Sequence, residues 1–132
     1  MIAKTIEIPY VFGDEFKLLP FSCLHYGNKT CDKKKLRADL KEHVDEKTII
    51  GGLGDWFDML IVKDAKRYRK AHDDCSGDDI IDEQIEGLAE IFRPYRKQIY
   101  FLGDGNHEDT MIALGTNPIK RFMLFCQMRN TQ

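Results

Sequence analysis

The sequence predicts an α/β protein with a mostly parallel sheet, because short apolar runs alternate with helical patterns along the chain. The apolar runs lie at residues 16–21, 48–53 and 98–102, and the helical patterns lie at residues 32–44 and 81–92. Strands joined by right-handed helical crossovers point the same way, so the loops that follow them gather at one edge of the sheet. In sheets of this kind, ligands bind at that edge.

The chain is expected to open with a β-hairpin. Residues 5–8 and 16–21 read as strands, and Gly13 and Asp14 between them are typical turn residues. The first strand of the sheet would therefore be preceded by an antiparallel neighbour.

A helix is predicted over residues 32–44. Leu36, Leu40 and Val44 recur there every four residues, as on one side of a helix. Asp32 is a residue type that caps a helix start. This helix would connect the first two parallel strands.

The middle of the chain should hold a buried strand and two more helices. The run at residues 48–53 is long enough only for a buried strand. Residues 59–71 are expected to form a helix with a basic outer face, and residues 72–79 a polar loop with a capping-box pattern. The clearest helix follows, since its apolar residues are spaced four, three and four apart and Pro94 marks its end. Those apolar residues are Ile81, Ile85, Leu88 and Phe92.

Two short helices are predicted after the strand at residues 98–102. Residues 111–114 are helical up to Gly115, a typical helix stop. Asn117 followed by Pro118 is a typical helix start. The chain would thus end on a helix.

Composition places the chain among soluble globular proteins. Its 132 residues suffice for one domain, 42% of them are hydrophobic and 32% are charged, and no apolar run is long enough to cross a bilayer. The N-terminus has no signal-peptide core, so a cytoplasmic location is expected, in a cell or in a phage-infected host. The net charge of -2 excludes a chain-wide electrostatic grip on nucleic acid. The four cysteines form no Cys-x-x-Cys pair, so reduced thiols are expected.

Each of the three predicted parallel strands is followed by a polar cluster. The clusters occupy residues 22–28, 54–58 and 103–109. They offer imidazole, carboxylate and carboxamide donors, which suit zinc, manganese or iron. Carboxylates are too costly to converge in one dry pocket unless a cation balances them. Topology would bring the clusters together although 82 positions separate His25 from His107 (107 minus 25), so a metal site is predicted at this edge.

In these clusters the sequence resembles the calcineurin-like metallophosphoesterases. That family carries Asp-x-His, Gly-Asp-x-x-Asp and Gly-Asn-His-Asp/Glu at successive strand ends. This chain has Cys-Leu-His at residues 23–25, Gly-Asp-Trp-Phe-Asp at residues 54–58 and Gly-Asn-His-Glu at residues 105–108. The resemblance runs over residues 16–114 and looks most like the phage-encoded and DNA-repair-nuclease branches. It implies a partial sandwich whose C-terminal half is missing, a single truncated domain over residues 1–132.

The resemblance also implies which residues bind metal. The family site holds two divalent ions, which here would be manganese, zinc or iron. Cys23 and His25 would bind the first ion. Asp55 would bridge both ions, and Asn106 would bind the second through its carboxamide oxygen.

The remaining motif residues would act on the substrate or would orient the metal ligands. His107 would contact the scissile phosphate and protonate the leaving oxygen. Asp58 and Glu108 would orient the ligands and their loops. The implied reaction is hydrolysis of a phosphodiester by a metal-bridging hydroxide. The family branch and the basic helix at residues 59–71 suggest nucleic acid as the substrate.

The chain departs from the family pattern in two ways. Cys23 stands where the family has aspartate, and a thiolate suits zinc or iron better than manganese or magnesium. Alternatively, Cys23 is only a small buried residue at a strand end. The family's C-terminal histidine loops are absent, since the last histidine is His107, and His43 and His72 read as surface residues. A fragment or natural truncation is therefore expected, whose exposed apolar flank would bind a complementing half or a second copy.

Three other interpretations compete with the enzyme. The chain is alternatively a catalytically impaired remnant that acts as a binding or accessory module, which Cys23 and the missing histidines favour. Cys31 and Arg37 have the Cys-x5-Arg spacing of cysteine phosphatases, but the residues between them look like a helix start, so we regard the match as chance. A generic α/β domain with polar turns does not account for histidine at two of the strand ends.

Overall fold

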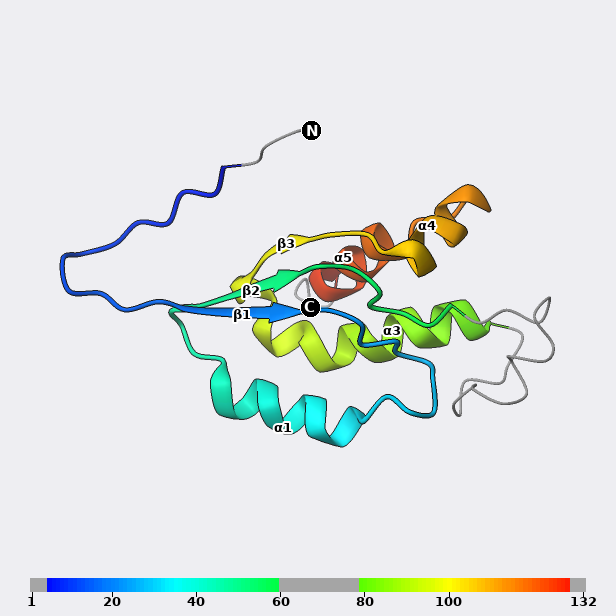
Figure 1. Cartoon of the computed structure of the whole chain (residues 1–132), viewed down its shortest axis with the longest axis horizontal. Coiled ribbons are helices and arrows are strands. Elements are labelled where there is room, and N and C mark those ends of the chain that lie inside the picture. The colour runs from blue at the N-terminus through cyan, green and yellow to red at the C-terminus, as the bar shows by residue number, and fades with distance from the viewer. Residues whose placement is uncertain (1–4, 60–78, 129–132) are drawn as a thin grey trace.

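The computed structural model describes residues 5–59 and 79–128, which form a three-stranded sheet flanked by helices (Figure 1). β1 (Lys17–Phe21) and β3 (Ile99–Leu102) lie on either side of β2 (Thr48–Gly52). Both pairings are parallel. The α/β class and the three predicted parallel strands are confirmed.

The central strand β2 leaves little room for side chains near its end. Ile50 is fully buried in the core. A side chain at Gly51 would collide with the ring of Phe101, and one at Gly52 would collide with the ring of Trp56. These two glycines therefore let aromatic rings from β3 and from the loop after β2 close over the strand.

The predicted helix between β1 and β2 is present as α1 (Lys33–His43). The Asp32 carboxylate accepts a hydrogen bond from the Lys35 amide at 2.8 Å, which confirms the predicted cap. Leu36 and Leu40 are buried and belong to the same core as β2. The apolar stripe thus attaches α1 to the sheet.

The core is completed by α3 (Ile80–Phe92) and α5 (Pro118–Met128), which pack against each other. Rings of Trp56, Phe92 and Phe122 meet with centroids 5.4–5.9 Å apart. Of the predicted apolar stripe of α3, Ile85, Leu88 and Phe92 are buried in this core, and Ile81 packs against it partly buried. The loop that follows β2 is therefore anchored in the core through its tryptophan.

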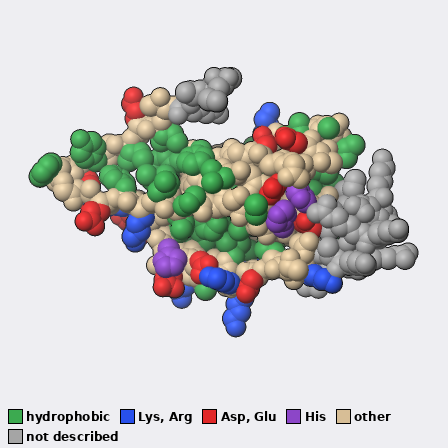
Figure 2. Space-filling view, viewed as in Figure 1, with side chains coloured by type: hydrophobic (Ala, Val, Ile, Leu, Met, Phe, Trp, Pro, Cys, Tyr) green, Lys and Arg blue, Asp and Glu red, His purple; other side chains and the backbone are tan. Residues whose placement is uncertain are grey.

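The other face of the sheet is open. Leu18 pairs with Ile49 and Gly51 pairs with Phe101, and alternation along the strands points these positions away from Ile50. Leu18 is 65% exposed and Phe101 is 39% exposed. Figure 2 shows hydrophobic side chains gathered near the strands. In the described ranges, exposed apolar side chains therefore lie on this face of the sheet. The expectation that the C-terminal apolar helix is uncovered is wrong, since Ile119, Phe122 and Cys126 of α5 are buried in the core.

The predicted hairpin at the start of the chain is wrong. A turn is present, since the Asp14 amide donates to the Val11 carbonyl at 2.9 Å, but residues 5–8 form no strand. Pro9 and Pro20 lack an amide hydrogen, which weakens pairing between the segments that flank the turn. The N-terminal segment instead extends away from the sheet before it turns back (Figure 1).

The third polar cluster is less of a loop than predicted. α4 (Asn106–Ala113) begins at Asn106 rather than at residue 111. The Glu108 carboxylate accepts a hydrogen bond from the Gly105 amide at 2.8 Å and so stabilises the first turn. The predicted end of the helix before Pro94 is confirmed, since α3 ends at Phe92. A 3₁₀ segment, η1 (Arg93–Gln98), follows it.

Some predictions fall on residues that the structure does not describe. The helix at residues 59–71 and the polar loop at residues 72–79, with His72, lie almost entirely outside the described ranges. Met59, which is described, is not helical. His43 is exposed at the end of α1, as predicted. Among the described helices, none is long and apolar enough to cross a bilayer.

Candidate metal centre

The loops after β1 and β2 run side by side at the carboxyl edge of the sheet. Backbone hydrogen bonds of 2.9–3.1 Å join them, from the amides of Cys23, His25 and Tyr26 to the carbonyls of Gly54, Asp55 and Trp56. These bonds continue the contact between the two strands past their ends. The first and second polar clusters are therefore brought together.

Glu108 attaches the third cluster to the second. Its buried carboxylate accepts hydrogen bonds from the amides of Asp55 at 2.9 Å, Phe57 at 3.0 Å and Gly105 at 2.8 Å. Such donors compensate the cost of burying a carboxylate. A side chain at position 105 would collide with Asp55, so glycine is needed for this close approach. Glu108 thus lies behind the loops and holds Asp55 in place.

The first candidate metal group consists of Cys23, His25 and Asp55. A sulfur, an imidazole nitrogen and a carboxylate oxygen, one from each residue, lie within 4.8 Å of one another. This donor set fits zinc or iron, which accept thiolate and imidazole together. Cys23 is exposed, so the alternative that it is a small buried residue is wrong.

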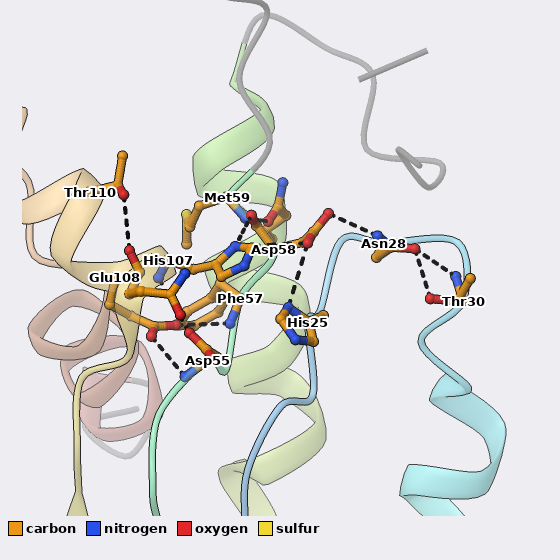
Figure 3. A network of polar contacts seen from close by, with 12 residues as sticks. His25, Asn28, Thr30, Asp55, Phe57, Asp58, Met59, His107, Glu108 and Thr110 are labelled. Atoms are coloured by element: carbon orange, nitrogen blue, oxygen red, sulfur yellow. Dashed lines mark hydrogen bonds and ion pairs between the residues drawn. The ribbon is translucent and has the colours of Figure 1, made fainter. Parts of the chain in front are cut away.

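A second group shares His25 and adds Asp58 and His107, again with donor atoms within 4.8 Å (Figure 3). Oδ1 of Asp58 is 3.6 Å from Nδ1 of His25 and 3.8 Å from Nδ1 of His107. Asp58 is only 2% exposed. The two imidazole rings meet edge to face with centroids 4.8 Å apart. Nδ1 of His25 is buried without a hydrogen bond, so a nearby cation would compensate an otherwise unsatisfied atom.

One hydrogen bond determines the orientation of His107. Nδ1 lies 2.7 Å from the backbone carbonyl oxygen of Asp58, and a carbonyl only accepts, so Nδ1 carries the hydrogen. In the neutral ring, Nε2 is then the unprotonated nitrogen. The His107 amide also approaches Oδ1 of Asp55 at 3.3 Å. His107 therefore lies beside Asp55 with Nε2 available to exchange a proton.

The backbone at this edge is strained. Cys23, His25, Asp55 and Met59 have φ values of 53°, 46°, 54° and 47°. In the described ranges they are the only non-glycine residues with positive φ. Such conformations cost about 1–3 kcal/mol each and cluster at functional sites. Three of these four residues belong to the first candidate metal group, which supports a function for this edge.

Negative charge is concentrated where α4 begins. Partial burial, together with the nearby carboxylates of Asp109 and Glu108, raises the pKa of Asp104 above its ordinary value, against the opposing effect of Lys120. Repulsion between these carboxylates would be reduced by a bound cation.

Two asparagines flank the groups. The predicted ligand Asn106 is the first residue of α4, directly before His107, and its side chain is exposed. Asn28 is missed by motif comparison, yet its Nδ2 donates to Oδ2 of Asp58 at 3.0 Å (Figure 3). The sequence signal that could have found Asn28 is a polar residue directly after a glycine, Gly27, within the first cluster. In the structure, Gly27 has a φ of +101°, which turns the loop at this point.

The geometry therefore brings His25, Asp55, Asp58 and His107 together from the loop after β1, the loop after β2 and the first turn of α4. Comparisons with known proteins assign no family to this arrangement: no family model, no curated protein and no solved structure matches the chain. The chemistry of the edge has to be inferred from its own residues and distances.

Proposed function

We propose that this chain is a metal-dependent phosphoesterase, acting as the N-terminal part of a catalytic domain that hydrolyses phosphodiesters. The observation that carries the proposal is the meeting of Cys23, His25 and Asp55 within 4.8 Å, with His107 beside Asp55. Thiolate, imidazole and carboxylate together are typical of a metal centre. A histidine with an available Nε2 next to such a centre is typical of proton transfer to an ester.

The ligand roles follow the donor groups. Cys23, His25 and Asp55 would hold one divalent ion, and Asp55 and Asn106 would share a second. When bound, such ions activate water and stabilise charge on the phosphoryl oxygens. Glu108 contributes by holding the Asp55 amide at 2.9 Å, which keeps the bridging carboxylate in position.

His107 would move the proton. Its Nδ1–H is held by the Asp58 carbonyl, so Nε2 is the atom that takes up and releases a proton. Once Nε2 is protonated, the imidazolium is stabilised by Oδ1 of Asp58, 3.8 Å away. Nε2–H would then be given to the leaving oxygen of the ester.

The substrate and partner are proposed on separate grounds. Nucleic acid is the substrate class that the family resemblance favours. The exposed side chains of Leu18 and Phe101 on the open sheet face support a partner, either a complementing C-terminal half or a second copy.

A catalytically impaired remnant that serves as a binding module is the second candidate. Cys23 in place of the family's aspartate favours it. Asp55 and Asn106 alone would bind a second ion weakly. This candidate predicts a folded protein without hydrolytic activity.

The enzyme is tested by incubating the purified chain with zinc, iron(II) or manganese, each in turn, and a chromogenic phosphodiester, beside His107→Ala and Asp55→Ala. We expect both variants to lose about 100-fold or more of the rate, because they remove the proton donor and the bridging ligand. His43→Ala is the matched control, since His43 is exposed at the far end of α1, and it should keep the wild-type rate. Unchanged rates in both site variants would contradict the proposed enzyme. Activity seen only after Cys23→Asp would favour the impaired remnant.

Metal binding is tested separately from activity. Zinc should bind stoichiometrically and be lost in His25→Ala. It should also protect the exposed Cys23 from a thiol reagent, with labelling assigned by peptide mass spectrometry. Cys126 is the internal control, because burial raises the pKa of its thiol to about 11 and keeps it unreactive with or without zinc. Labelling of Cys23 at the same rate with and without zinc would remove it from the ligand set.

A further inference from the structure

We infer that Asn28 is a positioning residue of this edge, which orients Asp58 so that one carboxylate oxygen faces both His25 and His107. Asn28 lies outside the motifs that carry the family resemblance. The inference rests on the proposed function, because it gives a task to a residue behind the proposed proton donor.

The loop determines which way the Asn28 amide points. Its Oδ1 accepts hydrogen bonds from the amide and the hydroxyl of Thr30, at 3.0 Å and 2.8 Å. The Thr30 amide can only donate, so the oxygen must lie on that side and the side-chain amide cannot be flipped. The backbone is held as well, since the Asn28 amide donates to the His25 carbonyl and its carbonyl accepts from Cys31, both at 2.9 Å. Nδ2 is therefore directed at Asp58.

Asp58 divides its two oxygens between different partners. Oδ2 accepts from Nδ2 of Asn28 at 3.0 Å, while Oδ1 is 3.6 Å from Nδ1 of His25 and 3.8 Å from Nδ1 of His107 (Figure 3). Rotation about the Cβ–Cγ bond of an aspartate is soft. A hydrogen bond to Oδ2 restrains that rotation and keeps Oδ1 toward the two imidazoles.

The Asn28–Asp58 bond also couples two loops that come from different strands. Asn28 follows β1 and Asp58 follows β2, 30 positions later. The Asp58 amide donates to the Tyr26 carbonyl at 2.9 Å, so backbone and side chain of Asp58 both depend on the first loop. Asn28 is neutral, and it therefore supports the carboxylate without a cation that would compete with the histidines for it.

Two substitutions separate positioning from a structural role. Asn28→Ala removes the whole amide. Asn28→Asp keeps the oxygen that accepts from Thr30, and with it the turn, but replaces the Nδ2 donor by a second oxygen facing Asp58. Asn117→Ala is the matched control, because Asn117 likewise accepts a backbone hydrogen bond, from Lys120 at 2.8 Å, at the start of α5.

The readouts are the ¹⁵N signals of the His25 and His107 imidazoles in metal-free protein at one pH, and kcat and KM with manganese and the chromogenic phosphodiester. We expect both Asn28 variants to change the imidazole signals. We also expect both to lower kcat by about 10- to 100-fold, with a much smaller effect on KM. Asn117→Ala should change neither readout.

A structural role for Asn28 predicts that Asn28→Asp resembles the wild type, and wild-type imidazole signals and kcat in that variant would overturn the inference. Altered imidazole signals with unchanged kcat would also overturn it. If the wild type shows no hydrolysis, the proposed function fails, and the imidazole signals alone decide whether Asn28 orients Asp58. If the wild type is active and Asn28→Asp is equally active, the proposed function stands and this inference fails.

Discussion

The two ends of the three-stranded sheet hold their charged residues in opposite ways. At the amino end, Lys17 forms an ion pair with Asp45 at 2.5 Å, and Lys47 forms one with Asp14. Both lysines are more than half exposed, at 59% and 53%. Water solvates these exposed charges in addition to the opposite charge, so the ion pairs do not depend on buried hydrogen bonds.

At the carboxyl end, the acids are buried instead. Asp58 is 2% exposed and Glu108 is fully buried. Their described contacts are with imidazoles, an asparagine amide and backbone amides. The left-handed non-glycine residues of the described ranges are also found here and not at the amino end.

The difference shows that the carboxyl end of the sheet is the energetically costly part of this fold. Burying a carboxylate is costly, and strained φ values add to the cost, so this edge is stable only because hydrogen bonds between loops compensate. At the amino end, the described ion-paired charges are exposed, and no described non-glycine residue has a positive φ. Substitutions at the carboxyl end should therefore destabilise the protein more than substitutions at the amino end.

The largest effect is expected from Glu108→Ala. Three backbone amides would lose their acceptor, the buried one of Phe57 and the part-buried ones of Asp55 and Gly105. An unsatisfied buried donor costs about 1–3 kcal/mol and a part-buried one costs less, so the free energy of unfolding should fall by about 3 kcal/mol. Urea unfolding followed by circular dichroism measures this loss. Glu46→Ala, at an exposed acid of the amino end, should keep the wild-type midpoint.

A Glu108→Ala protein as stable as the wild type would contradict this account. It would show that the three hydrogen bonds to the buried carboxylate contribute little to stability.

An intermediate effect is expected from Gly105→Ala. The added methyl group would collide with the carboxylate and amide of Asp55, so the loop must move at a cost of about 1–3 kcal/mol. Zinc binding should weaken with it, because Asp55 is displaced. Gly13→Ala is the matched control: φ is +97° there, but no atom lies within 4 Å of the added carbon. It should cost only the strain of the left-handed conformation, about 1 kcal/mol, and leave zinc binding unchanged. Equal loss of zinc binding in both variants would contradict the crowding argument.

The smallest effect is expected from Lys17→Met at the amino end. The hydrogen bond from Lys17, followed by the one from Thr48, holds the pKa of Asp45 below its ordinary value of 3.8. A carboxyl with a lowered folded-state pKa stabilises the fold above the ordinary value and loses that contribution as the pH falls through the folded-state value. The small difference in melting temperature between wild type and Lys17→Met should therefore shrink in high salt and vanish in acid. A difference that grows in acid would contradict this account.

Much of the fold is predictable because its signals are local. The cap at Asp32 and the spacing of Leu36 and Leu40 lie within one helix, and α1 forms where they indicate. Residues 5–8 alternate like a strand and yet form none, because a strand is stabilised by a partner that periodicity does not supply. The start of α4 at Asn106 is also not predictable from local pattern. Glu108 in its first turn is held by hydrogen bonds to the loop after β2, which is distant in sequence.

The order of the parallel strands and helices can be read from the amino-acid sequence, and so can the edge at which His25, Asp55 and His107 would meet. Both follow from hydrophobic periodicity and from the direction of parallel strands. The position of Asp58 between two histidines, with Asn28 bonded to it, is seen only in the folded chain. These contacts join loops from different strands, and ångström-scale distances between them depend on how the loops cross and not on any pattern within one segment.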